Sequence, residues 1–287
     1  MIQMEDTYLD IIKKAAVGNG LGEKKIAELS QVPITKITNF FNGYYCVSTL
    51  QTIAQILNLD FQSLKAHAEG HSQPPKILLD YLLQYQSEFT YRPNETLLVN
   101  HYLLIDTSKQ TALLFDTGTD AKDTLEYLKR NSLSLSAIFI THQHKDHIWA
   151  INQFTEAYPK VGIYASQESN DPRYSFNLIK ANNPQKFGSF EIEAYKTTGH
   201  TEDGMSFKAT GLSNQIIFVG DALFAHSQGG IYSREAYQHA LTINRSSILS
   251  QSDETILAPG HGPLSTVSHE KQNNPFYAKS ANALNTP

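Results

Sequence analysis

Apolar side chains over the first 69 residues recur at the spacing of amphipathic helices. They stand three or four positions apart, as in Leu50, Ile53, Ile56 and Leu57, and no strand-like alternation interrupts them. The pattern breaks where glycine, proline or asparagine occurs, at residues 18–22, 31–33, 42–43 and 58–60. It predicts four or five short helices.

A short linker is predicted after these helices. Residues 70–76 read GHSQPPK, and paired prolines favour an extended backbone that cannot continue a helix. We therefore expect a helical domain over residues 1–69, a linker over residues 70–76 and a second domain over residues 77–287.

The second domain is predicted to mix strands and helices. After one more expected helix, from residue 77 to about residue 86, short β-branched and apolar runs alternate with turn residues. These runs are TLLVNHYLLID, TALLFDTG, SAIFITH, KVGIYAS, SFEIEAYKTTGH, QIIFVGD and ETILAPGH. Helical patterns intervene at residues 119–130 and 234–249. The mixture predicts an α/β or α+β domain with a sheet in its core.

Composition excludes several classes of protein. Hydrophobic residues make up 40% of the 287 residues and charged residues 18%, which excludes disordered and collagen-like chains. The net charge of -5 gives no general attraction to nucleic acid or anionic lipid. The acidic start, MIQMEDTYLD, is unlike a secretory signal, and no apolar run reaches the length of a membrane span, so we expect a cytoplasmic protein. The single cysteine, Cys46, excludes an internal disulfide and a cysteine-rich zinc site.

Histidine and aspartate stand at the ends of several predicted strands. In THQHKDH, residues 141–147, four candidate ligands occupy six positions: His142, His144, Asp146 and His147. Three later apolar runs end at His200, Asp221 and His261. A metal ion needs such convergence, because three or four protein groups must approach it to about 2 Å. A single histidine at a strand end is more often hydrogen-bonded or exposed, but an ordered set on four elements favours a metal site.

The motifs resemble those of a known family. FDTG, THQHKDH, TTGHTEDGMSF, FVGDALF and APGHGP follow one another between residues 97 and 276 as they do in the metallo-β-lactamase superfamily. The resemblance implies a four-layer αββα sandwich with two metals in a cleft between the sheet edges. The tail HGPLSTVSHEKQNNPF, residues 261–276, is similar to that of glyoxalase II-like thioester hydrolases, in which a Glu-Lys pair precedes Asn-Pro-Phe.

The resemblance also implies a set of metal ligands. One metal would be held by His142, His144 and His200, a second by Asp146, His147 and His261, with Asp221 bridging the two. The implied ions are two divalent metals, zinc in the first place, with iron or manganese as alternatives. Asp116 is expected either to brace the HxHxDH loop or to belong to a plain Asp-Thr-Gly turn.

The chemistry that this centre implies is hydrolysis. Two divalent ions roughly 3.5 to 4 Å apart share a water and lower its pKa toward about 7, so that metal-bound hydroxide attacks a thioester or ester carbonyl. The same ions stabilise the oxyanion that forms. In this interpretation Asp146 and Asp221 are the catalytic residues, and the protein is a hydroxyacylglutathione hydrolase-like enzyme acting on a small molecule.

Some residues depart from the family pattern. Trp149 follows HxHxDH where many such hydrolases have glycine, and we expect it to pack under the loop rather than narrow the cleft. His226 is expected to be an ordinary loop histidine. Phe207 stands where a tyrosine often contacts a thiol-tripeptide, which weakens the prediction of glutathione specificity.

A different reaction shares part of the ligand set. Persulfide dioxygenases of the superfamily use a single iron on the positions corresponding to His142, His200 and Asp221, while retaining the other residues of the set. Three nitrogen and oxygen ligands suit non-haem iron as well as zinc, so the ligands alone do not separate an oxygenase from a hydrolase.

Residues 21–64 resemble the helix-turn-helix domain of phage repressors. Residues 23–30 would form its first helix, 31–32 the turn and 33–41 the recognition helix, which such domains place in the major groove of DNA. Residues 1–70 carry six basic and seven acidic side chains, however, and phosphate binding depends on an excess of cations. Two interpretations remain: a transcriptional regulator with a metallo-hydrolase sensor domain, or a helical module for homodimerisation or for covering the cleft.

Overall fold

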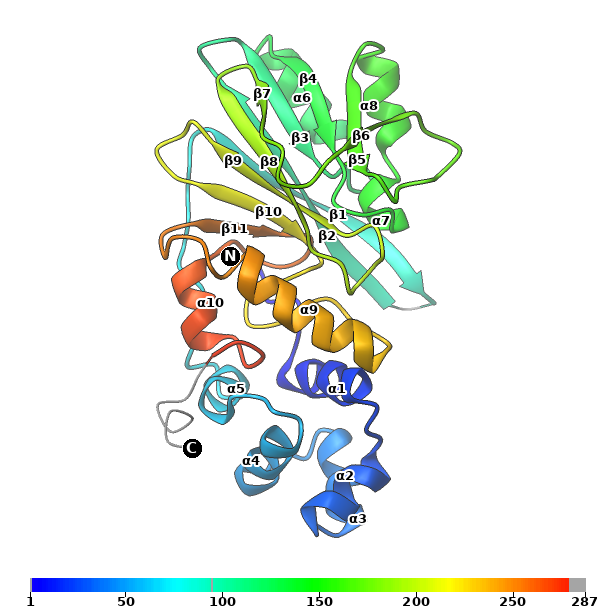
Figure 1. Cartoon of the computed structure of the whole chain (residues 1–287), viewed down its shortest axis with the longest axis vertical. Coiled ribbons are helices and arrows are strands. Elements are labelled where there is room, and N and C mark those ends of the chain that lie inside the picture. Colours follow the sequence, from blue (N-terminus) through cyan, green and yellow to red (C-terminus); the bar gives the residue numbers. More distant parts are fainter. Residues whose placement is uncertain (1, 94, 279–287) are drawn as a thin grey trace.

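The computed structural model describes residues 2–93 and 95–278, and two six-stranded sheets form its centre (Figure 1). In spatial order, the first sheet contains β1 (Leu82–Arg92), β2 (Glu95–Asp106), β3 (Thr111–Phe115), β4 (Ser134–Phe139), β5 (Gly162–Ser166) and β6 (Phe176–Ile179). The second contains β12 (Ser265–Thr266), β11 (Ile256–Pro259), β10 (Ile216–Gly220), β9 (Met205–Thr210), β8 (Phe190–Lys196) and β7 (Gln185–Phe187).

Helices cover the outer face of each sheet. The first sheet packs against α6 (Lys122–Arg130), α7 (Lys145–Ile148) and α8 (Ile151–Ala157), and the second against α9 (Arg234–Ser247) and α10 (Val267–Asn273). This arrangement confirms the predicted four-layer αββα sandwich. Within the described residues, no helix has the length and apolar character that a membrane crossing requires.

Aromatic side chains fill the space between the sheets. Phe115 and Phe139 of the first sheet meet Phe207 and Phe218 of the second, and all four are almost fully buried. The rings of Phe115 and Phe218 stack with their centroids 3.5 Å apart. Because successive side chains of a strand point to opposite faces of the sheet, the residues next to these phenylalanines in the sequence face outward and contact the helices.

Parallel strands direct the histidine and aspartate residues of the motifs to one edge of the sandwich. β3 pairs in parallel with β4, and β10 pairs in parallel with β11. Parallel neighbours end at the same edge of their sheet, so the segments that follow Phe115, Phe139, Gly220 and Pro259 emerge close together. The motif residues follow these strand ends directly.

The helix predicted over residues 77–86 is absent, and β1 begins there at Leu82 instead. β1 pairs with β2 from Leu82 opposite Leu104 to Arg92 opposite Glu95. The apolar residues near position 80 fit a helix as well as a strand. The partner strand, which lies later in the chain, determines the outcome, and local spacing does not contain that information.

The amino-terminal region forms five helices, as predicted. They are α1 (Tyr8–Asn19), α2 (Glu23–Ser30), α3 (Ile34–Phe41), α4 (Val47–Ile56) and α5 (Phe61–Ala68). We refer to α1–α5 as the helical module. Its division from the rest of the chain at residues 69 and 76 stays a prediction about domain boundaries.

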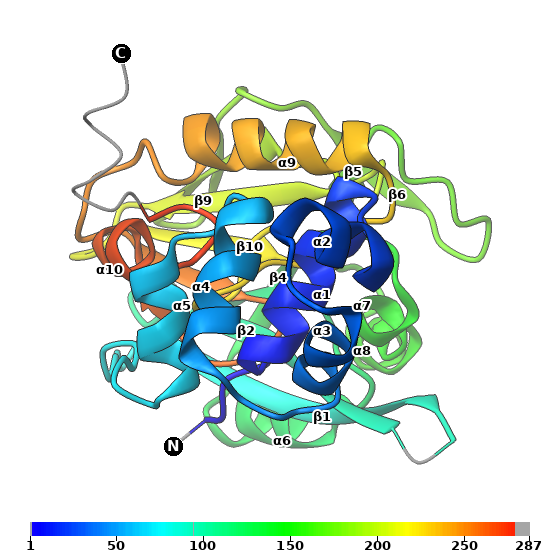
Figure 2. The same ribbon diagram turned by 90° about the horizontal axis from the view of Figure 1, so that it is seen from below.

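The helical module packs directly against the second sheet layer (Figure 1, Figure 2). α1 contacts α9, and α5 contacts α10. The buried side chains of the module belong to one hydrophobic cluster with Ile217, Val219, Tyr237 and Phe276. The amino-terminal helices and the sandwich therefore share a core.

A chain of three histidines joins the module to α10. His67 on α5 donates from Nε2 to the carbonyl of Asp6, at 2.9 Å, which leaves its Nδ1 to accept a hydrogen bond from His226 Nδ1 at 3.0 Å. His226 Nε2 then accepts from His269 Nε2 at 2.7 Å. This pattern is satisfied with all three rings neutral, because a neutral imidazole has one donor and one acceptor.

The contact between α1 and α9 can be tested at Gly18. Alanine normally stabilises a helix relative to glycine, by up to about 1 kcal/mol. A Cβ at this position would lie 2.4 Å from Tyr237 Cδ2, so we expect Gly18→Ala to destabilise the protein by about 1–3 kcal/mol. Thermal unfolding of Gly18→Ala, Tyr237→Leu and the double variant would measure this, and the double variant should lose less than the sum. A raised melting temperature for Gly18→Ala would contradict the packing.

The histidine chain predicts that the protein loses stability in acid. Burial, and then the neighbouring His67 and His269, lower the pKa of His226 to about 3. The unfolded chain binds a proton near pH 6.5, so stability falls as the pH falls below that value, by about 2 kcal/mol at pH 5 from this residue. In His226→Asn the titrating imidazole is gone, so the free energy of unfolding, measured with denaturant, should differ less between pH 7 and pH 5 than in the wild type. Asparagine is the replacement of choice because it tolerates the left-handed backbone of this position, at φ 62°.

The control is His71→Asn, which replaces an exposed histidine that is not one of the three in the histidine chain. Its free energy of unfolding should depend on pH as in the wild type. Equal dependence in the His226 and His71 variants would contradict the role given to His226.

Candidate metal centre

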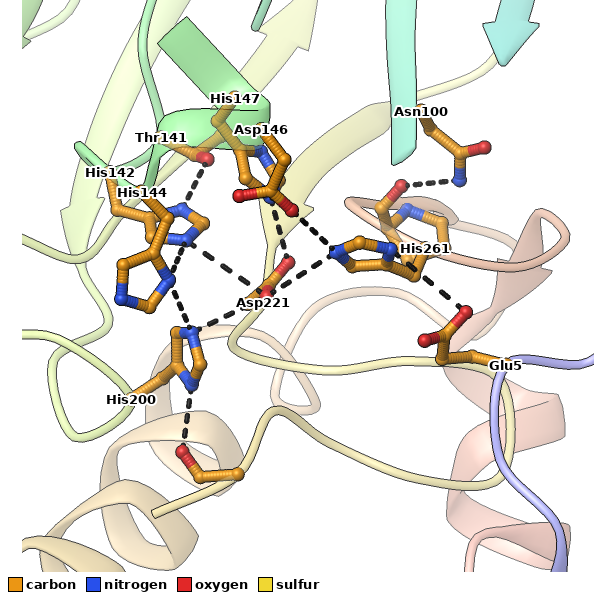
Figure 3. Close-up of polar contacts among 12 residues, drawn as sticks. Glu5, Asn100, Thr141, His142, His144, Asp146, His147, His200, Asp221 and His261 are labelled. Carbon is orange, nitrogen blue, oxygen red and sulfur yellow. Dashed lines mark hydrogen bonds and ion pairs between the residues drawn. The ribbon is translucent and has the colours of Figure 1, made fainter. Parts of the chain in front are cut away.

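The seven predicted ligands lie together at the edge of the sandwich, in two groups (Figure 3). Each group has its potential ligand atoms within 4.8 Å of one another. The first group contains His142, His144, His200 and Asp221, and the second contains Asp146, His147 and His261. All but His144 and His200 are buried.

Asp221 lies between the two groups. Its carboxylate is 3.3 Å from Nε2 of His200 on one side and 3.3 Å from Nε2 of His147 on the other. His261 Nε2 lies 3.6 Å from Asp221 Oδ2 and 3.4 Å from Asp146 Oδ2. Ligand atoms bonded at about 2.0 to 2.1 Å to a tetrahedral ion are separated by roughly 3.3 Å, so this spacing suits metal coordination.

Asp116 braces the HxHxDH loop. It accepts hydrogen bonds from the backbone and hydroxyl of Thr141, both at 2.8 Å, and from His147 Nδ1 at 2.8 Å. The last bond leaves Nε2 of His147 facing Asp221. Of the two interpretations of FDTG, the contacts favour the bracing one, in which a carboxylate fixes the orientation of a ligand histidine.

Backbone carbonyls orient two further histidines. His261 Nδ1 donates to Leu98 O at 2.8 Å, and His200 Nδ1 donates to Gly230 O at 2.8 Å. Both rings consequently direct Nε2 toward Asp221. Asn100 holds the turn around His261, because its side-chain amide donates to Pro259 O at 2.9 Å and to Gly262 O at 2.8 Å.

Glycine is required where the backbone approaches the centre. A Cβ on Gly260 would lie 2.2 Å from Asp221 Oδ1 and 2.6 Å from His147 Cε1. The glycine in the APGHGP motif therefore leaves the space that these two side chains occupy.

The charges of the centre suit a cation. Burial, followed by His147 nearby, lowers the pKa of His142 well below its usual value, so this ring is neutral and free to bind a metal. Burial alone would raise the pKa of Asp221, but His261 and His147 hold it well below the normal range. Burial alone would lower the pKa of His147 and His261, but Asp116 and Asp221 raise the pKa of His147 well above its usual value, and Asp221 and Asp146 raise the pKa of His261 to about 9. The centre thus combines a neutral imidazole and ionised carboxylates with two histidines whose protons a bound cation would replace.

Two buried polar atoms at the centre have no hydrogen-bond partner among the described residues: His147 Nε2 and Asp221 Oδ1. They lie 3.3 Å apart without forming a hydrogen bond, which is the separation of two ligand atoms on one ion. Because an unsatisfied buried polar atom is costly, the pair suits a shared metal ion. With nitrogen and oxygen donors only, the residues fit divalent zinc, iron or manganese.

Two sequence predictions near the centre need correction. Trp149 is 57% exposed, because the turn from α7 into α8 buries Ile148 and Ile151 instead. Phe207 is fully buried in the inter-sheet core, so it does not occupy a substrate-contacting position. His226 lies in the loop after β10, as expected, but it is fully buried there as the central member of the histidine chain.

Residues before α1 also contribute to the site, in a way that no sequence pattern predicts. The Glu5 carboxylate lies 3.9 Å from His261 Nδ1, and Asp6 accepts hydrogen bonds from Lys14 and Ser227. The acidic start of the chain carries these residues, but no local pattern distinguishes them from ordinary surface acids.

A cleft of about 920 Å³ opens over the metal centre. Asp221 and His261 lie on its floor. Its walls come from the amino-terminal residues and α1, from the hairpin that joins β1 to β2, and from the loop after β10. This cleft makes the side of the centre that carries Asp221 and His261 accessible from the surface.

Comparisons with known proteins agree with this geometry. The sequence model of the metallo-β-lactamase superfamily matches residues 96–261, a range that contains all seven predicted ligands. A probable metallo-hydrolase of Streptococcus pyogenes serotype M6 is 27% identical over 201 residues, which are 62% of this chain and 85% of that protein. A hydroxyacylglutathione hydrolase of Haemophilus ducreyi is 29% identical over 164 residues, 57% of this chain and 66% of that protein.

Solved structures show the same fold. The BLEG-1 B3 metallo-β-lactamase aligns with a TM-score of 0.58 and 26% identity, over 69% of this chain and 100% of that one. ETHE1 from Myxococcus xanthus aligns with a TM-score of 0.54 and 25% identity, over 66% of this chain and 87% of that one. Because the family model matches more than half of the sequence, the protein belongs to the metallo-β-lactamase superfamily.

Proposed function

We propose that the protein is a binuclear metal-dependent hydrolase of a thioester or ester. The observation that carries this proposal is the position of Asp221, whose two oxygens face His200 on one side and His147 on the other. In the proposed assignment, one ion is held by His142, His144 and His200, a second by Asp146, His147 and His261, and Asp221 belongs to both.

The protein side chains prepare this centre for hydrolysis. When two divalent ions are bound, they lower the pKa of a shared water and polarise the substrate carbonyl. Burial raises the pKa of Asp146, but the hydrogen bond with His261 and the charge of His147 lower it overall. Asp146 is therefore ionised at neutral pH, and its carboxylate can accept a hydrogen bond from the attacking water.

The thioester assignment is supported by the hydroxyacylglutathione hydrolase relative and by the carboxyl-terminal tail. Within that tail, Glu270 accepts hydrogen bonds from the backbone of His226 and from Asn274, both at 2.9 Å. Asn274 also donates to Ser227 O at 2.9 Å. These contacts hold the loop after β10, which forms one wall of the cleft, so the tail shapes this wall in addition to supplying His261.

A mononuclear iron dioxygenase is the alternative enzyme. It would use His142, His200 and Asp221 for its iron and would retain Asp146, His147 and His261, so the second group of residues is expected in either enzyme. The hydrolase is supported instead by the position of Asp221 between His200 and His147 and by the hydroxyacylglutathione hydrolase relative. Metal content and oxygen consumption with glutathione persulfide separate the two reactions.

DNA binding by the helical module stays a separate proposal. α3 has the exposed polar side chains Thr35, Lys36 and Asn39 that a recognition helix requires. The balanced charge of residues 1–70 opposes strong phosphate binding. A gel-shift titration with genomic fragments at low salt would test it, and an absence of retardation at micromolar protein would remove this proposal.

The hydrolase proposal predicts the effect of Asp221→Asn. The variant keeps the size of the side chain but removes the charge shared by the two ligand groups. We expect metal content to fall by at least one ion per chain and thioester hydrolysis to fall more than about 100-fold, beyond the loss typical of residues that only orient a ligand. Metal analysis and a thiol-release assay would measure both, with Asp253→Asn on the exposed surface as the control.

Gly260→Ala tests the packing around the same carboxylate. Because the added methyl group would overlap with Asp221 Oδ1, we expect weaker metal binding in a folded protein. Titration with zinc in competition with a chelator would show a raised dissociation constant. Gly230→Ala is the matched control, since its Cβ would meet only Tyr232, at 3.5 Å. Equal zinc affinities in the two variants would count against the proposed centre.

A further inference from the structure

The amino-terminal residues supply a wall of the cleft over the metals. The cleft is lined there by Glu5, Asp6 and four residues of α1: Asp10, Lys13, Lys14 and Val17. These residues precede the part of the chain that the family model matches. The helical module therefore adds to the site a surface that the family domain does not contain.

α1 presents two different faces. Ile11, Ile12, Ala15 and Ala16 are buried in the shared core, whereas Lys13 and Val17 are exposed. Residues four positions apart lie on the same side of a helix, so Lys13 and Val17 form a single strip facing the cleft. Burial of the opposite face fixes the direction of this strip.

Polar contacts fix α1 relative to the metal centre. Lys14 Nζ donates to Asp6 and, at 2.9 Å, to the carbonyl of Gln228. The following residue, Gly229, donates its N–H to Asp221 O at 2.9 Å. The wall is thus attached to the loop that carries the bridging carboxylate, so it is a rigid part of the site.

The charged side chains in the cleft leave one cation unpaired. Asp6 pairs with Lys14, Asp10 caps α1 through Thr7, and Arg92 lies 4.0 Å from Glu95. Glu5 faces His261, and Asp221 faces the ligand histidines. Among the described residues that line the cleft, Lys13 is the charged side chain with no ion pair or hydrogen bond. An incoming ligand can therefore gain a new ionic contact at Lys13.

We propose that α1 is a substrate-recognition wall and that Lys13 binds an anionic group, such as a carboxylate, on the substrate. This proposal rests on the proposed hydrolase function: the reacting carbonyl would lie at the metal centre, and a distant part of the same substrate would contact α1. A cleft of about 920 Å³ has room for such a molecule, since sites for small ligands measure roughly 300 to 1,000 Å³. Val17, which is 47% exposed, supplies an apolar contact beside the cation.

The test compares matched anionic and neutral substrates on the full-length, zinc-loaded protein. The first pair is the succinyl and butyryl thioesters of N-acetylcysteamine, which differ in charge on the acyl side. The second pair is the acetyl thioesters of N-acetylcysteine and N-acetylcysteamine, which differ in charge on the thiol side. The variants are Lys13→Ala and Lys13→Glu, with Lys24→Glu on the exposed surface of α2 as the control.

We expect wild-type protein to prefer the anionic member of at least one pair. Lys13→Glu should lower the ratio of kcat/KM between anionic and neutral substrates by roughly five- to tenfold, because attraction is replaced by repulsion. Lys13→Ala should have a smaller effect of the same sign, and Lys24→Glu none. Lys24→Glu should also hydrolyse the neutral thioesters at the wild-type rate. If, for both pairs, the ratio of kcat/KM between the anionic and the neutral substrate is the same in Lys13→Glu as in the wild type, the proposal is overturned.

Direct binding separates this proposal from the hydrolase function. If wild-type protein hydrolyses none of the four thioesters, the assigned reaction is wrong, and calorimetric titration with glutarate and butyrate still tests Lys13. Tighter binding of glutarate that is lost in Lys13→Glu but kept in Lys24→Glu would support the recognition wall. Equal affinities of glutarate for the wild type and Lys13→Glu would refute it.

Discussion

The organisation of the site depends on one buried carboxylate. Asp221 is removed from water and surrounded by the imidazoles of His142, His147, His200 and His261. A buried charge is tolerated only when compensating groups surround it. The segments that carry these four histidines must all reach the same point. The two sheets, the glycine before His261 and the hydrogen bonds of Asp116 each help to bring these segments together.

The helical module participates in this arrangement. It shares a hydrophobic cluster with β10, α9 and the carboxyl-terminal tail, and its Lys14 contacts the loop that follows Asp221. A boundary placed at residues 70–76 separates two sequence patterns, but it does not separate two cores. We therefore propose that the helices and the sandwich behave as a single cooperative unit in unfolding experiments.

The sequence could predict whatever depends on neighbours in the chain. The strand ends and the crowded THQHKDH motif indicated the candidate ligands that lie together in the structure, and the proline and glycine breaks indicated four or five helices, of which the structure has five. The strand at Leu82 was predicted as a helix because its pairing partner lies beyond the window in which spacing is informative. Glu5 and Lys14 were missed for a related reason: Lys14 contacts a carbonyl 214 positions later, and no periodic pattern encodes such a contact.

The shared core has a consequence for the order of assembly during synthesis. Residues of α1 leave the ribosome long before Tyr237 and Phe276, against which they pack. Local contacts within α2–α5 can form early, but the inner face of α1 must wait for almost the whole chain before it is covered. In a nascent chain α5 can cover part of α1, but the side of α1 that contacts α9 stays uncovered until residues 234–247 have been synthesised.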